Sequence, residues 1–134
     1  MNLYRKTASE IAEMIKNKEV TSEEVTKEFL QRIESLEDKV GAFSSVLNEK
    51  SLESAKKYDD DNNEDKRKEY DNTLLFGVPV ALKDNILSKG DLTTASSQIL
   101  KNYEGVYDAT VVEKLKKAGV PIIGKANMDE FAMG

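Results

Sequence analysis

The stretch "GVPVALKDN" at residues 77–85 is a short apolar run that ends in a lysine. Gly77 and Pro79 punctuate its start, and the run is too short for a helix, so it predicts a buried strand from about residue 78 to residue 83. Lys83 then stands at the carboxyl end of this strand. Either the lysine marks the point where the strand reaches water, or it is kept partly dry so that its neutral amine can react.

A second apolar stretch, "VPIIGK" at residues 120–125, predicts the next strand. Between the two strands lie a Gly/Ser/Thr-rich segment, "SKGDLTTASSQIL" (88–100), which predicts a loop, and "ATVVEKLKKAG" (109–119), which predicts a helix. A strand–loop–helix–strand order is typical of a right-handed crossover, so we expect the two strands to be parallel and in one sheet.

The helix of this crossover has a start signal and a stop signal. Asp108 precedes it and is expected to cap its first turn, whereas Gly119 is expected to end it. Its apolar side chains are expected to pack against the sheet: Val111, Val112 and Leu115. Parallel strands usually have helices on both faces, which favours an α/β fold.

The amino-terminal region predicts two amphipathic helices, each introduced by a capping box. Thr7 with Glu10 and Thr21 with Glu24 have the required spacing, and Gly41 follows the second helix where a stop is expected. The apolar faces either pack on their own domain or suit a partner subunit. The first face consists of Ile11, Met14 and Ile15, and the second of Val25, Phe29, Ile33 and Leu36.

The middle of the chain predicts one more strand, one more helix and a charged excursion. "AFSSVL" (42–47) is compatible with a short strand, and a helix is expected to begin near Asn48. Residues 59–72 are almost wholly charged or amide, which indicates a surface helix end or loop. Together the elements predict an α/β fold in which helices cover the first strands of a mixed sheet. The strands predicted here are too few to form a stable sheet covered by helices on both faces. We therefore expect residues 1–134 to be the truncated front part of one larger domain.

The composition excludes several kinds of chemistry. The chain has no cysteine and no histidine, which excludes disulfides, thiol nucleophiles and histidine acid–base catalysis within it. Acidic residues outnumber basic ones by 25 to 20, giving a net charge of −5, so direct binding of RNA by this region is not expected. The start of the chain has no apolar signal segment, and no apolar run approaches the length of a membrane span. We expect a cytoplasmic protein with no membrane partner.

The lysines at the ends of the two predicted strands are the candidates for chemistry. Functional side chains gather at the carboxyl ends of strands in open α/β sheets, where Lys83 and Lys125 both stand. Desolvation disfavours the ammonium form of lysine, and a neutral amine can act as a general base toward a serine hydroxyl. Spacing alone favours the simpler alternative, in which Lys83 is a charge at the end of a strand.

Several segments resemble the amidase signature family, and within it the glutaminase subunits of tRNA-dependent amidotransferases. The resemblance covers the whole chain except the charged excursion at residues 59–72. "KDN" after an apolar strand is moderately specific, and "GKANMDEFAMG" (124–134) favours these subunits over other amidases. The segments are "TASEIAEMIKNKEVTSEEV" (7–25), "GVPVALKDNI" (77–86), "LTTASSQIL" (92–100) and "YDATVVEKLKKAGVPIIGKANMDEFAMG" (107–134).

The resemblance implies a Ser–Ser–Lys triad in which Lys83 is the catalytic lysine. It also implies a loop lining the substrate channel, formed by Phe131, Ala132, Met133 and Gly134. The family's two serines lie in a G-G-S-S-G-G-S type segment that residues 1–134 do not contain, and Ser96 and Ser97 are not equivalent to them. The chain alone is therefore expected to be inactive. We expect three hydroxyl side chains near the site to serve mainly as structural hydrogen-bonding groups: Thr93, Thr94 and Ser97.

By the same resemblance, the parent subunit would hydrolyse glutamine and supply ammonia for converting Glu-tRNA(Gln) to Gln-tRNA(Gln). It would work in a heterotrimer with subunits B and C, in which a partner subunit uses ATP and magnesium while tRNA is bound outside this region. No cofactor and no metal is expected in this chain. Two alternatives stay open: a fragment of a stand-alone amidase, and a non-catalytic fragment that binds a partner.

Overall fold

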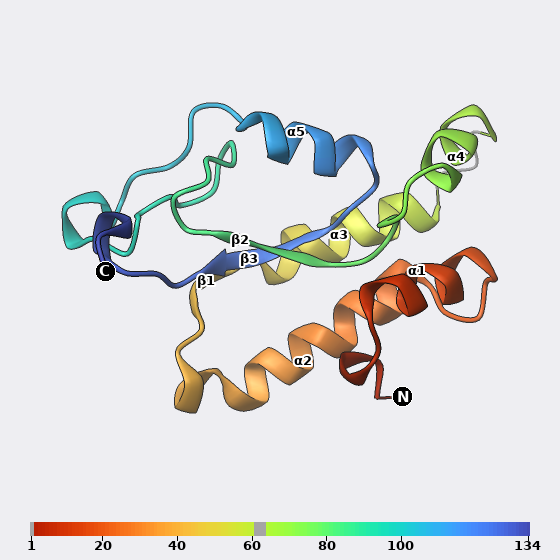
Figure 1. Cartoon of the computed structure of the whole chain (residues 1–134), viewed down its shortest axis with the longest axis horizontal. Coiled ribbons are helices and arrows are strands. Elements are labelled where there is room, and N and C mark those ends of the chain that lie inside the picture. The colour runs from red at the N-terminus through yellow and green to blue at the C-terminus, as the bar shows by residue number, and fades with distance from the viewer. Residues whose placement is uncertain (1, 61–63) are drawn as a thin grey trace.

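The computed structural model describes residues 2–60 and 64–134, in which helices surround a three-stranded mixed sheet (Figure 1). This confirms the α/β class and the mixed sheet predicted above. The helices are α1 (Ala8–Lys16), α2 (Ser22–Val40), α3 (Asn48–Asp59), α4 (Glu64–Asp71) and α5 (Thr110–Lys117), and the strands are β1 (Phe43–Val46), β2 (Val80–Lys83) and β3 (Ile122–Ala126). Short 3₁₀ turns span Leu3–Arg5, Gln98–Leu100 and Glu130–Ala132.

Both amino-terminal helices begin with the predicted capping box. The side chains of Thr7 and Thr21 accept hydrogen bonds from the backbone N–H groups of Glu10 and Glu24, whose carboxylates accept from the threonine backbones in return. Gly41 ends α2 in the left-handed conformation, with φ of 60°, which only glycine adopts without strain. Local sequence signals therefore set these helix ends.

The apolar faces of α1 and α2 pack mainly on their own domain. A core cluster joins the two helices to the first 3₁₀ turn and to the segment before β2. Its buried members are Leu3, Ile11, Ile15, Val20, Val25 and Val78. Further along the α2 stripe, Ile33 and Leu36 are only half-buried.

The three strands are arranged in the order β1–β3–β2. β2 is parallel to β3, as the crossover predicts, whereas β1 pairs with β3 in the antiparallel direction. Gly124 permits a close approach of β1, because a Cβ atom at this position would lie 2.7 Å from the carbonyl oxygen of Ser45. β3 is thus the central strand and β2 lies at an edge of the sheet.

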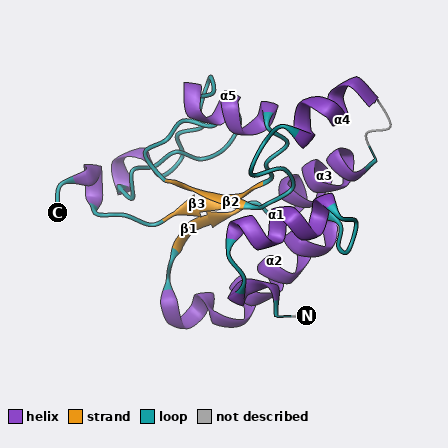
Figure 2. Ribbon diagram, turned by 45° about the vertical axis from the view of Figure 1, so that its right-hand side comes forward, coloured by secondary structure: helices purple, strands orange, loops and turns teal. Residues whose placement is uncertain are grey.

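One face of the sheet is covered by α5, and α1 and α2 lie on the other side of the sheet (Figures 1 and 2). Under α5, Leu82 of β2 packs with Val112 and Ile122. Leu115 packs against the same cluster, but the prediction for Val111 was wrong, because its side chain is 47% exposed. A helix of two turns that lies on a sheet buries only one stripe, and Val111 points away from it.

The predicted cap of α5 was also wrong. Ala109 occupies the N-cap position, with no side-chain hydrogen bond to the helix. Asp108 instead accepts hydrogen bonds from the backbone N–H of Lys89, at 2.7 Å, and from Lys116 Nζ, at 2.8 Å. Its carboxylate therefore ties the preceding loop to the last turn of α5.

The predicted strand at residues 42–47 and the helix beginning near Asn48 are confirmed as β1 and α3. The charged excursion falls partly outside the described residues, at 61–63, and its described part includes the short helix α4. Tyr70 of α4 stacks on Phe76, with ring centroids 5.0 Å apart. Across the described ranges, no helix combines the length and the apolar character needed to cross a bilayer.

Candidate active site at the carboxyl ends of two parallel strands

The two candidate lysines lie at the ends of neighbouring strands, but their side chains have opposite environments. Lys83 is the last residue of β2, and its side chain is exposed. Side chains alternate between the faces of a strand, so Lys83 points away from the face where Leu82 packs under α5. Of the buried strand predicted at residues 78–83, only Val80–Lys83 form β2, and the buried positions are Val78 and Leu82, because the face of β2 that carries Ala81 and Lys83 is uncovered.

Lys125 of the central strand is the lysine that is buried, with 0% of its side chain exposed. Its Nζ donates to the backbone carbonyl of Leu92, at 3.2 Å, and to Thr93 Oγ1, at 3.0 Å. It also lies 3.5 Å from the carboxylate of Asp84, which is likewise 0% exposed. The end of β3 therefore carries a buried ion pair with hydrogen-bonding partners.

Asp84 directly follows Lys83 and joins β2 to the loop after it. Its carboxylate accepts from the backbone N–H of Thr94, at 3.2 Å, and from the Thr94 hydroxyl. Burial by itself would raise the pKa of Asp84, but hydrogen bonds from Thr94 and Ser44 and the charge of Lys125 outweigh it and lower the pKa. The carboxylate is thus held in its ionised form.

Burial acts in the opposite direction on Lys125. It disfavours the ammonium form and lowers the pKa of Lys125, while the charge of Asp84 and their hydrogen bond act against that change. The two groups therefore depend on each other: removing one would leave the other charged and unpaired in the interior, which is costly.

A tight crossing of two segments adjoins this ion pair. The loop containing Thr94–Ser97 meets the segment after β3, and both contain residues with positive φ: Ala95, Ser96, Phe131 and Ala132. The Phe131 N–H donates to the Ala95 carbonyl at 3.0 Å, and Ser97 Oγ donates to the carboxylate of Glu130 at 2.6 Å. Thr93, Thr94 and Ser97 all make the side-chain hydrogen bonds expected of them here.

The predicted channel segment, Phe131–Gly134, lies on the surface in this chain. Phe131 is 44% exposed and Met133 is 84% exposed. Figure 1 shows this end of the chain beside the loop that follows β2. The structure therefore brings the segment to the same end of the sheet as Lys83, and the link between them runs through Asp84 and Ala95.

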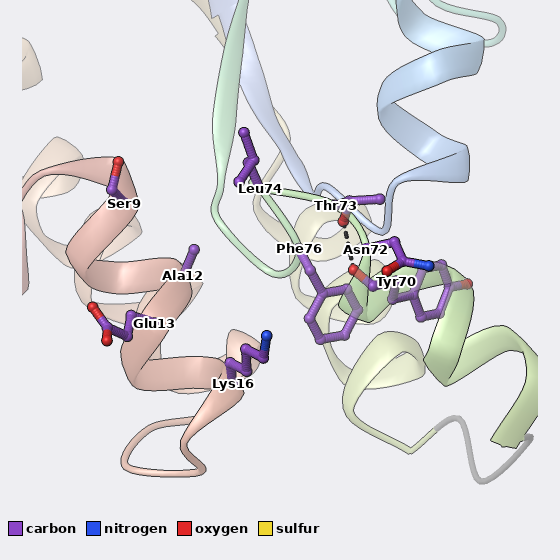
Figure 3. Close-up of a pocket in the computed structure, with 9 residues that line it drawn as sticks. All are labelled: Ser9, Ala12, Glu13, Lys16, Tyr70, Asn72, Thr73, Leu74 and Phe76. Carbon is purple, nitrogen blue, oxygen red and sulfur yellow. Dashed lines mark hydrogen bonds between the residues drawn. The ribbon is translucent and has the colours of Figure 1, made fainter.

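A pocket of about 340 Å³ opens elsewhere, between α1 and the segment that leads into β2 (Figure 3). Its wall includes the side chains of Lys16 and Glu13 and the ring of Phe76. Leu74 at its rim is 87% exposed. Neither candidate lysine lines it, so the chemistry proposed for the strand ends does not use this pocket. The lining residues are Ser9, Ala12, Glu13, Lys16, Tyr70, Asn72, Thr73, Leu74 and Phe76.

Sequence reasoning missed Asp84 as a partner of Lys125. The signal was present, because a carboxylate directly after one strand and a lysine at the end of the neighbouring parallel strand are brought to the same edge. Among residues 2–60 and 64–134, no group of three or more Asp and Glu side chains is placed to hold a metal ion. The residues around the two strand ends offer amines, hydroxyls and the buried carboxylates of Asp84 and Asp91.

Solved structures share this fold over nearly the whole chain. The peptide amidase from Stenotrophomonas maltophilia superposes with a TM-score of 0.85 at 26% identity, covering 97% of this chain and 26% of that one. The A-subunit of glutamyl-tRNA(Gln) amidotransferase from Thermotoga maritima superposes with a TM-score of 0.72 at 36% identity, covering 100% of this chain and 25% of that one.

Sequence comparison agrees with the structural one. A protein from Fusobacterium nucleatum named as the A-subunit of glutamyl-tRNA(Gln) amidotransferase is 47% identical to this chain, covering 99% of this chain and 26% of the relative. A protein of the same name from Clostridium acetobutylicum is 50% identical, covering 100% of this chain and 27% of the relative. The chain thus spans about a quarter of the length of these relatives. A model of the amidase family matches residues 24–134, most of the chain. With the fold, the relatives and this match in agreement, the chain belongs to the amidase family.

Proposed function

We propose that this chain is the amino-terminal part of the glutaminase subunit of a tRNA-dependent amidotransferase. The observation that carries the proposal is the similarity to proteins named as the A-subunit of glutamyl-tRNA(Gln) amidotransferase, at 43–50% identity along the full 134 residues or nearly so. The complete subunit hydrolyses glutamine to glutamate and ammonia. The ammonia is then used to convert Glu-tRNA(Gln) to Gln-tRNA(Gln).

In this proposal Lys83 is the general base of a Ser–Ser–Lys triad. Its amine accepts a proton from one serine hydroxyl, which in turn takes the proton of the nucleophilic serine. The nucleophile attacks the side-chain amide carbon of glutamine, ammonia leaves, and water hydrolyses the resulting acyl-enzyme. Support comes from the position of Lys83 at the carboxyl end of β2.

Lys83 is exposed here, so its desolvation is assigned to parts of the protein beyond residues 1–134. The face of β2 that carries Ala81 and Lys83 is uncovered, and the relatives are about four times as long as this chain. Segment Phe131–Gly134, exposed at the same end of the sheet, is proposed to line the glutamine channel. Residues 1–134 contain no G-G-S-S-G-G-S type segment, so they alone are expected to hydrolyse no glutamine.

The remaining parts of the reaction are proposed to lie outside this chain. Subunits B and C complete a heterotrimer in the cytoplasm, a partner subunit uses ATP with magnesium, and tRNA is bound through the complex. The net charge of −5 supports the view that this region does not itself bind tRNA. A partner-binding role without catalysis would describe residues 1–134 in isolation.

A stand-alone amidase is the second candidate, favoured by one observation. The peptide amidase from Stenotrophomonas maltophilia superposes with a higher TM-score, 0.85, than the Thermotoga maritima protein, at 0.72. Identity points the other way, at 26% against 36%. Because loops and substrates diverge within one fold, identity is the better guide to the substrate.

Reconstitution of the complete subunit distinguishes the two candidates. We expect glutamine-dependent formation of Gln-tRNA(Gln) when the subunit is combined with subunits B and C, ATP and magnesium, and none when it is replaced by residues 1–134. Ammonium chloride in place of glutamine serves as the control for the partner subunits. Hydrolysis of peptide amides, together with failure to support glutamine-dependent amidation, would favour the stand-alone amidase.

A further inference from the structure

We propose that Asp84, Thr94 and Lys125 form a positioning cluster. The cluster fixes the position of the Lys83 amine relative to the segment Phe131–Gly134. The inference rests on the proposed function, in which Lys83 is the general base. It assigns a role to a buried ion pair that the triad itself does not use. None of the three residues is proposed to contact glutamine.

The backbone directly after Lys83 is hydrogen-bonded to two other segments. The N–H of Asp84 donates to the carbonyl of Ala126 on β3, and the carbonyl of Asp84 accepts from the N–H of Ala95, both at 3.0 Å. The carbonyl of Lys83 itself accepts from the N–H of Ile86, at 2.9 Å. The strand end that carries the amine is therefore held on one side by the central strand and on the other by the loop.

The carboxylate of Asp84 links the end of β2 to the loop and to β3. It is hydrogen-bonded to both the backbone N–H and the hydroxyl of Thr94, and it faces Lys125 Nζ at 3.5 Å, with both charged side chains 0% exposed. A buried charge cannot move away from its partners without losing their compensation. The carboxylate thus fixes the position of the loop relative to the end of β2.

Ala95 connects this loop to the proposed channel segment. Ala95, which binds the backbone of Asp84 through its N–H, accepts a hydrogen bond from Phe131 N–H through its carbonyl, at 3.0 Å. Ala95 and Phe131 have φ of 48° and 53°, a conformation that persists in non-glycine residues only where the surroundings impose it. One short path of hydrogen bonds therefore connects the residue after Lys83 to the proposed substrate segment.

Stability alone is a weak explanation for this cluster. A buried ion pair generally contributes little net stability compared with apolar residues of similar volume, because both charges lose their hydration. The chain also contains a surface pair of similar chemistry, in which Asp108 binds one backbone N–H and one lysine Nζ. That pair lies at α5, and both of its partners, Lys89 and Lys116, are outside β2 and the Asp84 cluster, which makes it a matched control.

The test uses the complete subunit bound to subunits B and C. Asp84→Asn removes the charge, Thr94→Val removes the hydroxyl at nearly constant shape, and Thr94→Ser keeps it. Asp108→Asn is the control, and Lys83→Ala gives the activity without the base. For each variant, kcat and KM for glutamine are measured, and ammonia-dependent amidation by the same preparation reports how much complex is correctly assembled.

We expect Asp84→Asn and Thr94→Val to lower kcat for glutamine by up to about 100-fold, the effect of a misplacement near 1 Å, with KM for glutamine and ammonia-dependent amidation unchanged. Thr94→Ser restores kcat, and Asp108→Asn keeps the wild-type values. A merely structural role would lower the glutamine-dependent and ammonia-dependent rates together, which would overturn the inference. If Asp84→Asn does not assemble, the Thr94→Val and Thr94→Ser comparison decides, because both variants keep the ion pair.

The outcomes separate this inference from the proposed function. If the wild type hydrolyses no glutamine, or if Lys83→Ala hydrolyses it normally, the proposed function is wrong and the inference fails with it. If Lys83→Ala is inactive while the Asp84 and Thr94 variants match the wild type, only the positioning cluster is wrong.

Discussion

The end of edge strand β2 and the end of central strand β3 carry the same residue type in opposite environments. Lys83 ends β2 with an exposed side chain, whereas Lys125, one residue before the end of β3, is 0% exposed and paired with Asp84. Both follow short apolar runs of similar composition. The difference arises from the face that each side chain occupies: Lys125 pairs with Leu82 in the parallel register and lies among buried partners, whereas Lys83 points to the uncovered face of β2.

This comparison separates two tasks that a lysine at a strand end can perform. Lys125 uses its donors for Leu92, Thr93 and Asp84 and is committed to holding the structure together. Lys83 has an exposed amine directed away from the α5 face and available to other partners in the complete protein. The lysine proposed as the general base is thus the one that this chain does not bury.

The largest expected effect is on stability, from breaking the buried pair. Lys125→Met leaves the carboxylate of Asp84 in the interior without its counter-charge, and we expect a loss of about 3–5 kcal/mol of unfolding free energy. Lys83→Met, at an exposed position, is expected to stay within about 0.5 kcal/mol of the wild type. Urea unfolding followed by circular dichroism measures both.

The double variant Asp84→Asn/Lys125→Met sharpens this comparison. It removes both charges and is expected to be more stable than Lys125→Met alone, because no unpaired charge remains. Equal losses for Lys83→Met and Lys125→Met would contradict the contrast between the two strand ends.

A smaller loss of unfolding free energy is expected from substitutions in α5, the helix that packs on one face of the sheet. Val112 is fully buried beside Leu82, so Val112→Ala should cost about 1–3 kcal/mol through lost burial and the cavity it leaves. Val111→Ala removes the same atoms from a side chain that is 47% exposed and should cost less than about 0.5 kcal/mol. The same unfolding measurement tests the pair, and similar losses would show that α5 sits differently on the sheet.

These contrasts show which features could be predicted from the sequence. The two capping boxes, the stop at Gly41 and the parallel pairing of β2 with β3 follow from signals only a few residues long or from a general rule of chain connection. Such features do not depend on what distant segments do. They were predicted correctly.

The incorrect predictions depended on distant contacts. Asp108 is a residue type that often caps helices, but its carboxylate binds Lys89 and Lys116 instead. Val111 is apolar, but it lies on the side of α5 that faces away from the sheet. The pairing of Asp84 with Lys125 joins two separate strand ends and needs the sheet order to be known. The exposure of Lys83 likewise depends on which face of β2 other elements cover, which the residues of β2 alone do not reveal.

The role assigned to Lys83 can be checked with the single variant Lys83→Ala in the complete protein, assembled with its partners. We expect glutamine-dependent amidation to fall by about 100- to 10,000-fold, as is typical when a general base is removed, while ammonia-dependent amidation is unchanged. Lys101→Ala, at another exposed lysine, should leave both rates at the wild-type level. Unchanged use of glutamine by Lys83→Ala would contradict the assignment, because the exposed strand-end amine would then have no part in the reaction.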